Sequence, residues 1–248
     1  MKGPALAWPS ACGRDAVAAN AAAGPEAPAG AQTLARGLAA LEIVAAAENG
    51  MTVQEMAERL GVHRTIASRL LCALAGHRLI ARDAGGRYRV GSGVIALARQ
   101  YEPVLKAAAG GVLRHLADKV GATALVTVHD GDSGVAVAVV EPAGLVAHLV
   151  YRPGHRSPLD RGAAAYALRS QLPPEPGEPP GVARARRDKY AIAHGEVTAG
   201  AYGVAAPIPR APGERPACVL LITVDRQLAD SALPAVTDAA RQISALLA

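Results

Sequence analysis

The chain has 248 residues, enough for two modest domains that each bury a core of their own. Hydrophobic residues make up 51% of it, but many of these are alanine, phenylalanine is absent and aromatic residues reach only 3%. Single-stranded nucleic acid is usually bound by stacking bases on aromatic side chains, so this class of partner is disfavoured. The formal net charge of +5 makes double-stranded DNA the more suitable nucleic-acid partner.

The N-terminal segment, residues 1–31, is rich in Ala, Gly and Pro and is predicted to be a disordered tail. Lys2 precedes only a short apolar stretch that prolines interrupt, so we expect no secretory signal and no membrane contact. Three widely separated cysteines, Cys12, Cys72 and Cys218, predict reduced thiols, with Cys72 on the core side of its helix. These features favour a cytoplasmic protein.

Residues 32–93 predict a DNA-binding domain of three helices and a β-hairpin wing. Leucines spaced three and four apart predict the first helix over 33–48. Thr52 followed three residues later by Glu55 is a capping box, so a second helix should start at Thr52 and end before Gly61.

A third helix beginning near His63 has the composition of a recognition helix, which inserts its N-terminal residues into the major groove of DNA. Its apolar residues Ile66, Leu70, Leu71 and Leu74 are expected to face the core. The side chains expected to contact DNA from this region are Thr52, His63, Arg64, Thr65, Ser68 and Arg69.

The predicted wing consists of strands at 79–82 and 87–90 joined by a Gly-Gly turn, with Arg82, Arg87 and Arg89 placed beside the phosphate backbone. Residues 32–95 hold eight arginines and five acids, a net charge of +3, whereas the longer remainder over 96–248 carries only +2. A helix-turn-helix or a hairpin alone can be a plain packing unit. Their order and their charge together favour DNA binding.

A linker helix is expected over 94–102, before Pro103, and a second domain over 103–248. Amphipathic segments predict helices, β-branched runs predict strands, and a proline-rich stretch predicts a loop. The helices are expected at 104–120, 162–171 and 228–247, the strands at 124–129, 135–141, 145–151, 203–208 and 217–224, and the loop at 172–181. The fold class is therefore α+β.

Over roughly residues 32–248 the chain resembles the IclR family of bacterial transcriptional regulators. The similar segments lie in the first helix, across the helix turn, in the wing and at two places in the second domain. They are GLAALE at 37–42, RLGVHRTIASRLL at 59–71, GRYRVG at 86–91, GHRSPL at 154–159 and GVAAPI at 203–208.

This resemblance implies a winged helix-turn-helix joined by a helix to a GAF-like α/β effector domain. It also implies a homodimer or homotetramer that binds a palindromic operator and regulates a metabolic operon, as a repressor or an activator. The effectors of such regulators are usually carboxylic or aromatic acids. No cofactor and no metal are expected.

The resemblance also implies where an effector would bind, although the chain departs from the family there. Relatives have Gly-Lys where this chain has Ala165-Tyr166, and a Ser-x-Ser pair where it has Leu221 and Thr223. The expected effector-binding residues are Arg161, Gly162, Ala163, Ala164, Gly203, Leu221 and Thr223.

At this position a helix starts, and its free amides could receive a carboxylate while Arg161 adds a positive charge. Arg161 could equally be a solvated surface charge or an ion-pair partner. The departures from the family predict either an effector more apolar than a small oxoacid or a cavity that has lost its ligand.

Residue patterns typical of enzymes are weak in this sequence. Five histidines in the second domain are scattered without metal-ligand spacing, and neither a G-x-S-x-G elbow nor a P-loop occurs. Two hypotheses remain: a regulator that binds DNA, and an enzyme or small-molecule sensor whose winged domain serves only dimerisation.

Overall fold

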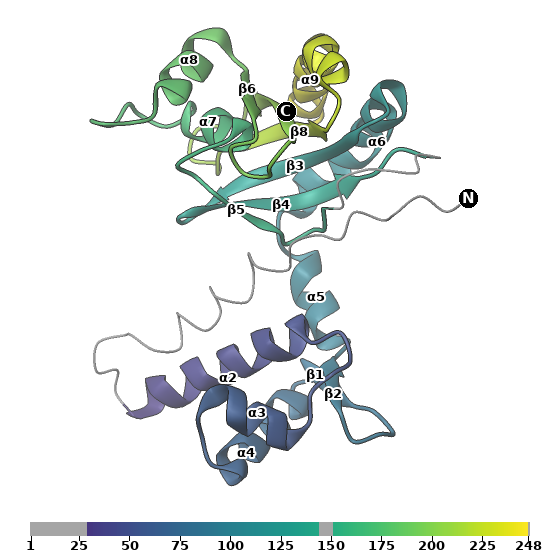
Figure 1. Ribbon diagram of the computed structural model, residues 1–248, viewed down its shortest axis with the longest axis vertical. Coiled ribbons are helices and arrows are strands. Elements are labelled where there is room, and N and C mark those ends of the chain that lie inside the picture. The colour runs from purple at the N-terminus through teal and green to yellow at the C-terminus, as the bar shows by residue number, and fades with distance from the viewer. Residues whose placement is uncertain (1–28, 144–150, 248) are drawn as a thin grey trace. The chain divides into compact units, whose positions relative to one another are not determined.

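The computed structural model describes residues 29–143 and 151–247, and the chain divides into two compact units between Tyr101 and Glu102 (Figure 1). Most of the tail predicted over 1–31 and of the strand predicted over 145–151 lies outside the described residues. The first described helix begins at Ala29, so three residues that we had assigned to the tail are helical. Alanine favours helix, and Ala29 to Ala31 contain no proline to stop one.

The first unit contains the predicted helices followed by a two-stranded wing. Its elements are α2 (Ala29–Ala46), α3 (Val53–Leu60), α4 (Arg64–Gly76), β1 (Ile80–Arg82), β2 (Tyr88–Val90) and α5 (Gly93–Arg99). The wing strands are antiparallel, with Ile80 paired to Val90. The winged helix-turn-helix that the sequence predicted is thus confirmed.

The core of the first unit lies where α2, α3 and α4 meet the wing, around Met56 and Leu71. Two expectations about α4 were wrong, because Ile66 and Cys72 are both exposed. The buried face of α4 is formed instead by Ala67, Leu70, Leu71 and Leu74. Successive helical residues differ by about 100° in direction, so Ile66 and Cys72, each adjacent to a buried residue, point away from the core.

The second unit is a six-stranded antiparallel sheet with helices on both faces. Its elements are α6 (Pro103–Val120), β3 (Thr123–Asp130), β4 (Ser133–Val140), β5 (Arg156–Pro158), α7 (Ala163–Arg169), α8 (Pro180–Asp188), β6 (Ala191–His194), β7 (Tyr202–Ile208), β8 (Ala217–Thr223) and α9 (Arg226–Leu247). The strand order across the sheet is β5-β4-β3-β8-β7-β6.

Helices α6 and α9 pack together on one face of this sheet, whereas α7 packs on the other and α8 contacts α7 and β6 (Figure 1). The α+β class is confirmed, but β5, β6 and α8 were not predicted. Helix α8 begins at prolines that we had read as loop. Proline suits the first turn of a helix, where its missing N–H would have no partner.

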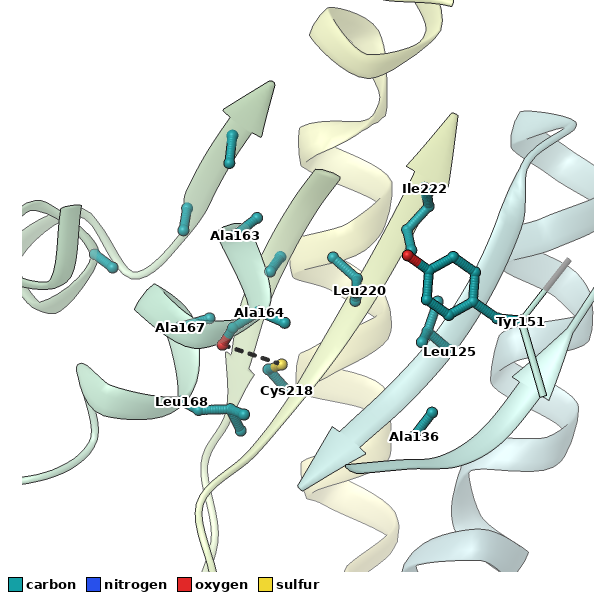
Figure 2. Packing of buried hydrophobic residues seen from close by; sticks show 14 of the residues in the cluster. Leu125, Ala136, Tyr151, Ala163, Ala164, Ala167, Leu168, Cys218, Leu220 and Ile222 are labelled. Atoms are coloured by element: carbon teal, nitrogen blue, oxygen red, sulfur yellow. Dashed lines mark hydrogen bonds between the residues drawn. The ribbon is translucent and has the colours of Figure 1, made fainter. Parts of the chain in front are cut away.

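Strand β8 is buried along its whole length, and its residues alternate between the two faces of the sheet. Cys218, Leu220 and Ile222 lie on the α7 side, together with Ala163 and Ala164 (Figure 2). The Cys218 thiol lies 3.9 Å from the Ala164 carbonyl oxygen, and burial raises the pKa of this thiol. Leu221, in contrast, is fully buried on the opposite face, which α9 covers.

Among the described residues, no helix combines the length and the apolar character needed to cross a bilayer.

Candidate functional sites

The N-terminus of α4 presents the side chains that were predicted to contact DNA. His63 is the N-cap, and its Nδ1 accepts a hydrogen bond from the Thr65 backbone N–H at 3.3 Å. Arg64, Thr65 and Arg69 are exposed, and Ser68 is half-buried. Within the described part of the chain, neither Arg64 nor Arg69 forms a hydrogen bond or an ion pair, so both guanidinium groups are available to a partner.

Thr52 has an internal role that the prediction of DNA contact did not consider. Its hydroxyl accepts from the Glu55 N–H at 3.2 Å and donates to the Glu55 carboxylate at 2.9 Å. The Thr52 N–H donates to the same carboxylate at 2.7 Å, which completes the predicted capping box. Because these bonds occupy its hydroxyl, we no longer assign Thr52 to DNA contact.

Arg87 was predicted to contact phosphate, but the structure places its guanidinium inside the domain. Nη2 lies 2.8 and 2.9 Å from the two carboxylate oxygens of Glu55 and donates to the Gly50 carbonyl oxygen at 3.1 Å. Nε donates to the Asn49 carbonyl oxygen at 2.9 Å. These bonds tie the wing to the start of α3, and Arg87 is therefore a positioning residue.

Arg89 and Arg82 also have internal contacts, although both remain exposed. Arg89 pairs with Asp83 at 3.0 Å and donates to the carbonyl oxygens of Glu48 and Asn49, each at 3.1 Å. Arg82 donates to the Gly86 carbonyl oxygen at 3.2 Å, and its guanidinium carbon lies 5.9 Å from the centroid of the Tyr88 ring. Of the three wing arginines, Arg82 has the fewest internal contacts.

Two carboxylates of the first unit are held in their charged form. The pKa of Glu55 is lowered from 4.5 to about 2, mainly by the Thr52 backbone N–H and then by Arg87 and the Thr52 hydroxyl. The pKa of Asp83 is also lowered, first by the Arg87 backbone N–H and then by the Arg89 side chain. The wing is therefore fastened by charge-assisted hydrogen bonds at its turn and at β2.

The second unit contains a cavity of about 60 Å³ between α7, the sheet and the loop that joins β6 to β7. Its apolar lining includes Leu125, Ala136, Leu220 and Ile222, and its polar lining includes Thr127, Tyr151, His155, Ser157, Arg161, Glu196 and Thr198. The apolar lining and few polar groups are typical of a small-molecule site. Within the described residues, no group of three or more His, Cys, Asp or Glu is placed to hold a metal ion.

Five of the seven predicted effector-binding residues line this cavity, and two do not. The five are Arg161, Gly162, Ala163, Ala164 and Gly203. Leu221 and Thr223 were wrong, because strand alternation directs Leu220 and Ile222 toward the cavity instead. The Thr223 hydroxyl accepts from the Asp225 N–H at 3.1 Å, at the start of α9.

Glu196 occupies the amide that we expected to receive a carboxylate from an effector. One of its carboxylate oxygens accepts from the Gly162 N–H at 2.8 Å and from the Tyr166 hydroxyl at 2.6 Å. Burial, and then Glu196, raise the pKa of Tyr166, so the phenol stays protonated and donates this bond. One of the amides expected to be free at the start of this helix is therefore already occupied, because the chain supplies a carboxylate itself.

Thr127 lies in the wall of the cavity with its hydroxyl unsatisfied. The residue is 2% exposed, and its Oγ1 has no hydrogen-bond partner among the described residues. The pairing of β3 with β4 shifts register between Val126 and Thr127. A buried polar atom without a partner costs about 1–3 kcal/mol, so Thr127 is a natural contact for a ligand.

The other ionisable groups of the cavity are either paired or neutral. Arg161 forms an ion pair with Asp160 at 3.1 Å, and its side chain is 54% exposed. Burial lowers the pKa of His155, whose ring packs edge-on against Tyr151 with the centroids 4.8 Å apart. Of the two interpretations of Arg161, the ion pair is the one observed.

The first unit matches the family model of the IclR helix-turn-helix domain over residues 33–84. Residues 33–84 are thus similar to the helix-turn-helix domain of IclR proteins. An HTH-type transcriptional regulator of Mycobacterium tuberculosis is 33% identical over 148 residues, which cover 59% of this chain and 56% of that protein. The match thus spans just over half the length of this curated relative.

Solved structures of IclR proteins are similar in fold to this chain over most of its length. An IclR homologue from Microbacterium hydrocarbonoxydans, crystallised with 4-hydroxybenzoate, gives a TM-score of 0.76 at 20% identity and covers 87% of this chain and 98% of its own. An IclR transcriptional regulator from Alicyclobacillus acidocaldarius gives 0.70 at 22% identity with the same coverages. The resemblance to the IclR family inferred from the sequence is confirmed.

Glu196 and Thr127 are among the polar cavity residues that the sequence did not reveal. The replacement of Gly-Lys by Ala165-Tyr166 was visible in the sequence. Glu196, which accepts a hydrogen bond from the Tyr166 hydroxyl, lies 30 residues further along the chain. Thr127 falls in an apolar run, where a threonine looks like an ordinary strand residue.

Proposed function

We propose that this chain is a sequence-specific transcriptional regulator that binds duplex DNA through α4 and a small-molecule effector through the cavity of its second unit. The observation that carries the proposal is the pair of guanidinium groups of Arg64 and Arg69 at the start of the recognition helix, which are exposed and have no partner among the described residues. Thr65 and Ser68 add hydroxyl groups on neighbouring turns. Such side chains bind base edges and phosphates.

In this proposal the wing arginines divide their roles. Arg82 is the wing residue best placed to meet phosphate, because its internal contacts are the weakest. Arg87 and Arg89 hold the hairpin in place, so they affect DNA binding through the position of the wing. Base specificity then depends on α4, whereas the wing contributes affinity for any sequence.

We also propose that the regulator is a homodimer, or a tetramer built from dimers, that binds a palindromic operator of a metabolic operon. Leu34 and Leu38 of α2 and Ile95 and Leu97 of α5 are each more than half exposed. Helix α5 has only seven residues and no buried side chain, and so short a helix is unstable on its own in water. A second copy covering these residues would stabilise it.

A small-molecule effector is supported by the cavity and by its unsatisfied Thr127. The Microbacterium homologue was crystallised with 4-hydroxybenzoate, which makes a small aromatic compound a reasonable type of ligand here. Binding in one unit would change operator affinity by favouring one arrangement of the DNA-binding units.

Selection of bound duplexes from a random DNA pool tests the proposal. The selection should be run at a stated, near-physiological salt concentration, because phosphate contacts make DNA affinity depend on salt. We expect a palindromic sequence to be enriched. Salt-sensitive binding without enrichment would contradict sequence-specific regulation and favour an enzyme or sensor whose winged domain serves dimerisation.

A further inference from the structure

We propose that the cavity selects an uncharged effector, with an apolar body and one hydrogen-bonding group for Thr127, and excludes carboxylates. The inference takes the cavity to be the effector site and therefore rests on the proposed function. It goes further in naming the class of ligand and the residue that sets this class, Glu196.

The first step is that Glu196 already occupies the Gly162 amide at the start of α7. The Glu196 carboxylate lies 2.8 Å from the Gly162 nitrogen and 2.6 Å from the Tyr166 hydroxyl oxygen, and Glu196 itself lines the cavity. A ligand carboxylate placed there would compete with Glu196 for the Gly162 amide and would lie beside a like charge, which solvent screens in part because Glu196 is exposed. Either effect weakens the binding of an acid.

The loop that presents Glu196 is held against the cavity by its neighbours as well. An ideal Cβ placed on Gly162 would come within 2.6 Å of a Val197 methyl carbon, which shows how closely this loop approaches α7. The Thr198 hydroxyl lies 3.4 Å from the Tyr151 hydroxyl. The position of Glu196 is thus fixed by the packing of its loop.

The second step is that the cavity has little positive charge to offer an acid. Arg161 is the one Lys or Arg among the described lining residues, and Asp160 already pairs with it at 3.1 Å. Its side chain is also 54% exposed, so solvent screens its charge. His155 is half-buried against Tyr151, an environment that disfavours an imidazolium.

The third step is that the cavity offers a built contact for a neutral polar group. The Thr127 hydroxyl is buried without a partner, and it can both donate and accept. The residues around it include Leu125, Leu220 and Ile222, which suit a ring or a branched chain. A carbonyl, amide or hydroxyl group attached to such a body would satisfy Thr127 without bringing a charge.

Matched pairs of a carboxylic acid and its amide test the proposed preference for neutral ligands directly on the full chain. Calorimetric titration at neutral pH would compare benzoate with benzamide, 4-hydroxybenzoate with 4-hydroxybenzamide, and cyclohexanecarboxylate with cyclohexanecarboxamide. We expect at least one amide to bind about tenfold more tightly than its acid. The comparison uses the unaltered protein, so it does not depend on any variant folding.

Variants then assign the effect to residues. Glu196→Gln should reduce the ratio of the acid's Kd to the amide's Kd about tenfold. Glu175→Gln, at an exposed glutamate outside this cavity, should leave this ratio unchanged. Thr127→Val, which keeps the shape but removes the hydroxyl, should weaken the favoured amide about fivefold or more.

The proposal is overturned if the acids bind the unaltered chain as tightly as the amides. It is equally overturned if Glu196→Gln behaves like Glu175→Gln, or if none of the six compounds binds at about 5 mM, the weakest affinity that the titration detects. These titrations contain no DNA. Failure to enrich a palindrome would therefore reject the regulator and leave the proposed ligand class unaffected. Enrichment of a palindrome together with failure of these titrations would reject the ligand class alone.

Discussion

Arginines of two kinds lie in the first unit, and only their contacts distinguish them. Arg64 and Arg69 have no partner within the described residues, whereas Arg87 makes four hydrogen bonds to Asn49, Gly50 and Glu55. All three are surface residues by type. Removal of the first kind should affect what the protein binds, and removal of the second should affect how the domain holds together.

Arg69→Ala should lower operator affinity by about 1–3 kcal/mol and relax specificity at one base pair. The cause is the loss of a base-edge or nearby phosphate contact from α4. Titration of the selected duplex at fixed salt measures it, with Arg226→Ala on the exposed surface of α9 as the control. Unchanged affinity and unchanged sequence preference would remove Arg69 from the interface.

The Glu55 carboxylate should make the first unit sensitive to acid. Its folded-state pKa is about 2 against an ordinary value of 4.5, so its contribution to stability is present above pH 4.5 and is lost as pH falls toward 2. Glu55→Gln should therefore lower Tm at neutral pH, and the difference from the unaltered protein should shrink through this window. Thermal unfolding at a series of pH values measures the difference. A constant difference at all pH values would contradict the assignment.

The capping box could be predicted from sequence because its two members are three residues apart. The same Glu55 also binds Arg87, 32 residues away, and no local pattern reports such a pair. The prediction that Arg87 contacts phosphate therefore did not include its internal role, and the contact itself stays a prediction. An arginine in a wing is consistent with a contact to phosphate and with an internal ion pair, and only the folded chain reveals the ion pair.

At the scale of elements, the face of the sheet to which a side chain points was harder to predict than the position of its strand in the sequence. The sequence placed β8 almost correctly, but it assigned Leu221 and Thr223 to the cavity, where Leu220 and Ile222 lie. Because side chains in a strand alternate, a shift of one residue exchanges the two faces. Strand β8 is apolar on both faces, so its pattern could not reveal which residues face α7.

Helix α4 gives a test at this scale through two adjacent residues. Leu71 is fully buried at the centre of the first core, whereas its neighbour Cys72 is exposed. Leu71→Ala should lower the free energy of unfolding by about 2–5 kcal/mol. Cys72→Ala should change it by less than about 0.5 kcal/mol. Urea denaturation of both variants measures these values, and equal effects would contradict the observed orientation of α4.

At the scale of the molecule, the exposed apolar residues of the first unit support the proposed dimer. We expect the double variant Ile95→Ser/Leu97→Ser to shift a dimer toward monomer and to lose tight binding of a palindrome, since one copy contacts one half-site. Sedimentation velocity measures the shift. Leu246→Ser, at an equally exposed position on α9, serves as the control. A dimer that persists in the double variant would place the interface elsewhere.

The architecture of both units could be predicted more fully than either site. The winged domain followed from caps, turns and periodicity, all of which are local. In the second unit, β5 and β6 are three and four residues long, too short to leave a periodic pattern. The cavity is lined by residues from β3, β4, β5 and the residues before it, the start of α7, the segment from β6 to β7, and β8, so its polar groups could be recognised only once the sheet had assembled.

The bond between Glu196 and the Gly162 amide also has a consequence for how such proteins diverge. One side chain on a loop supplies the negative charge, and the sheet, the helix and the apolar wall do not depend on which atom the amide binds. If the cavity selects neutral effectors as proposed, a substitution at position 196 alone would separate effectors that are neutral from effectors that are acids. After gene duplication, two copies of this chain could come to answer different metabolites without any change in the residues that read DNA.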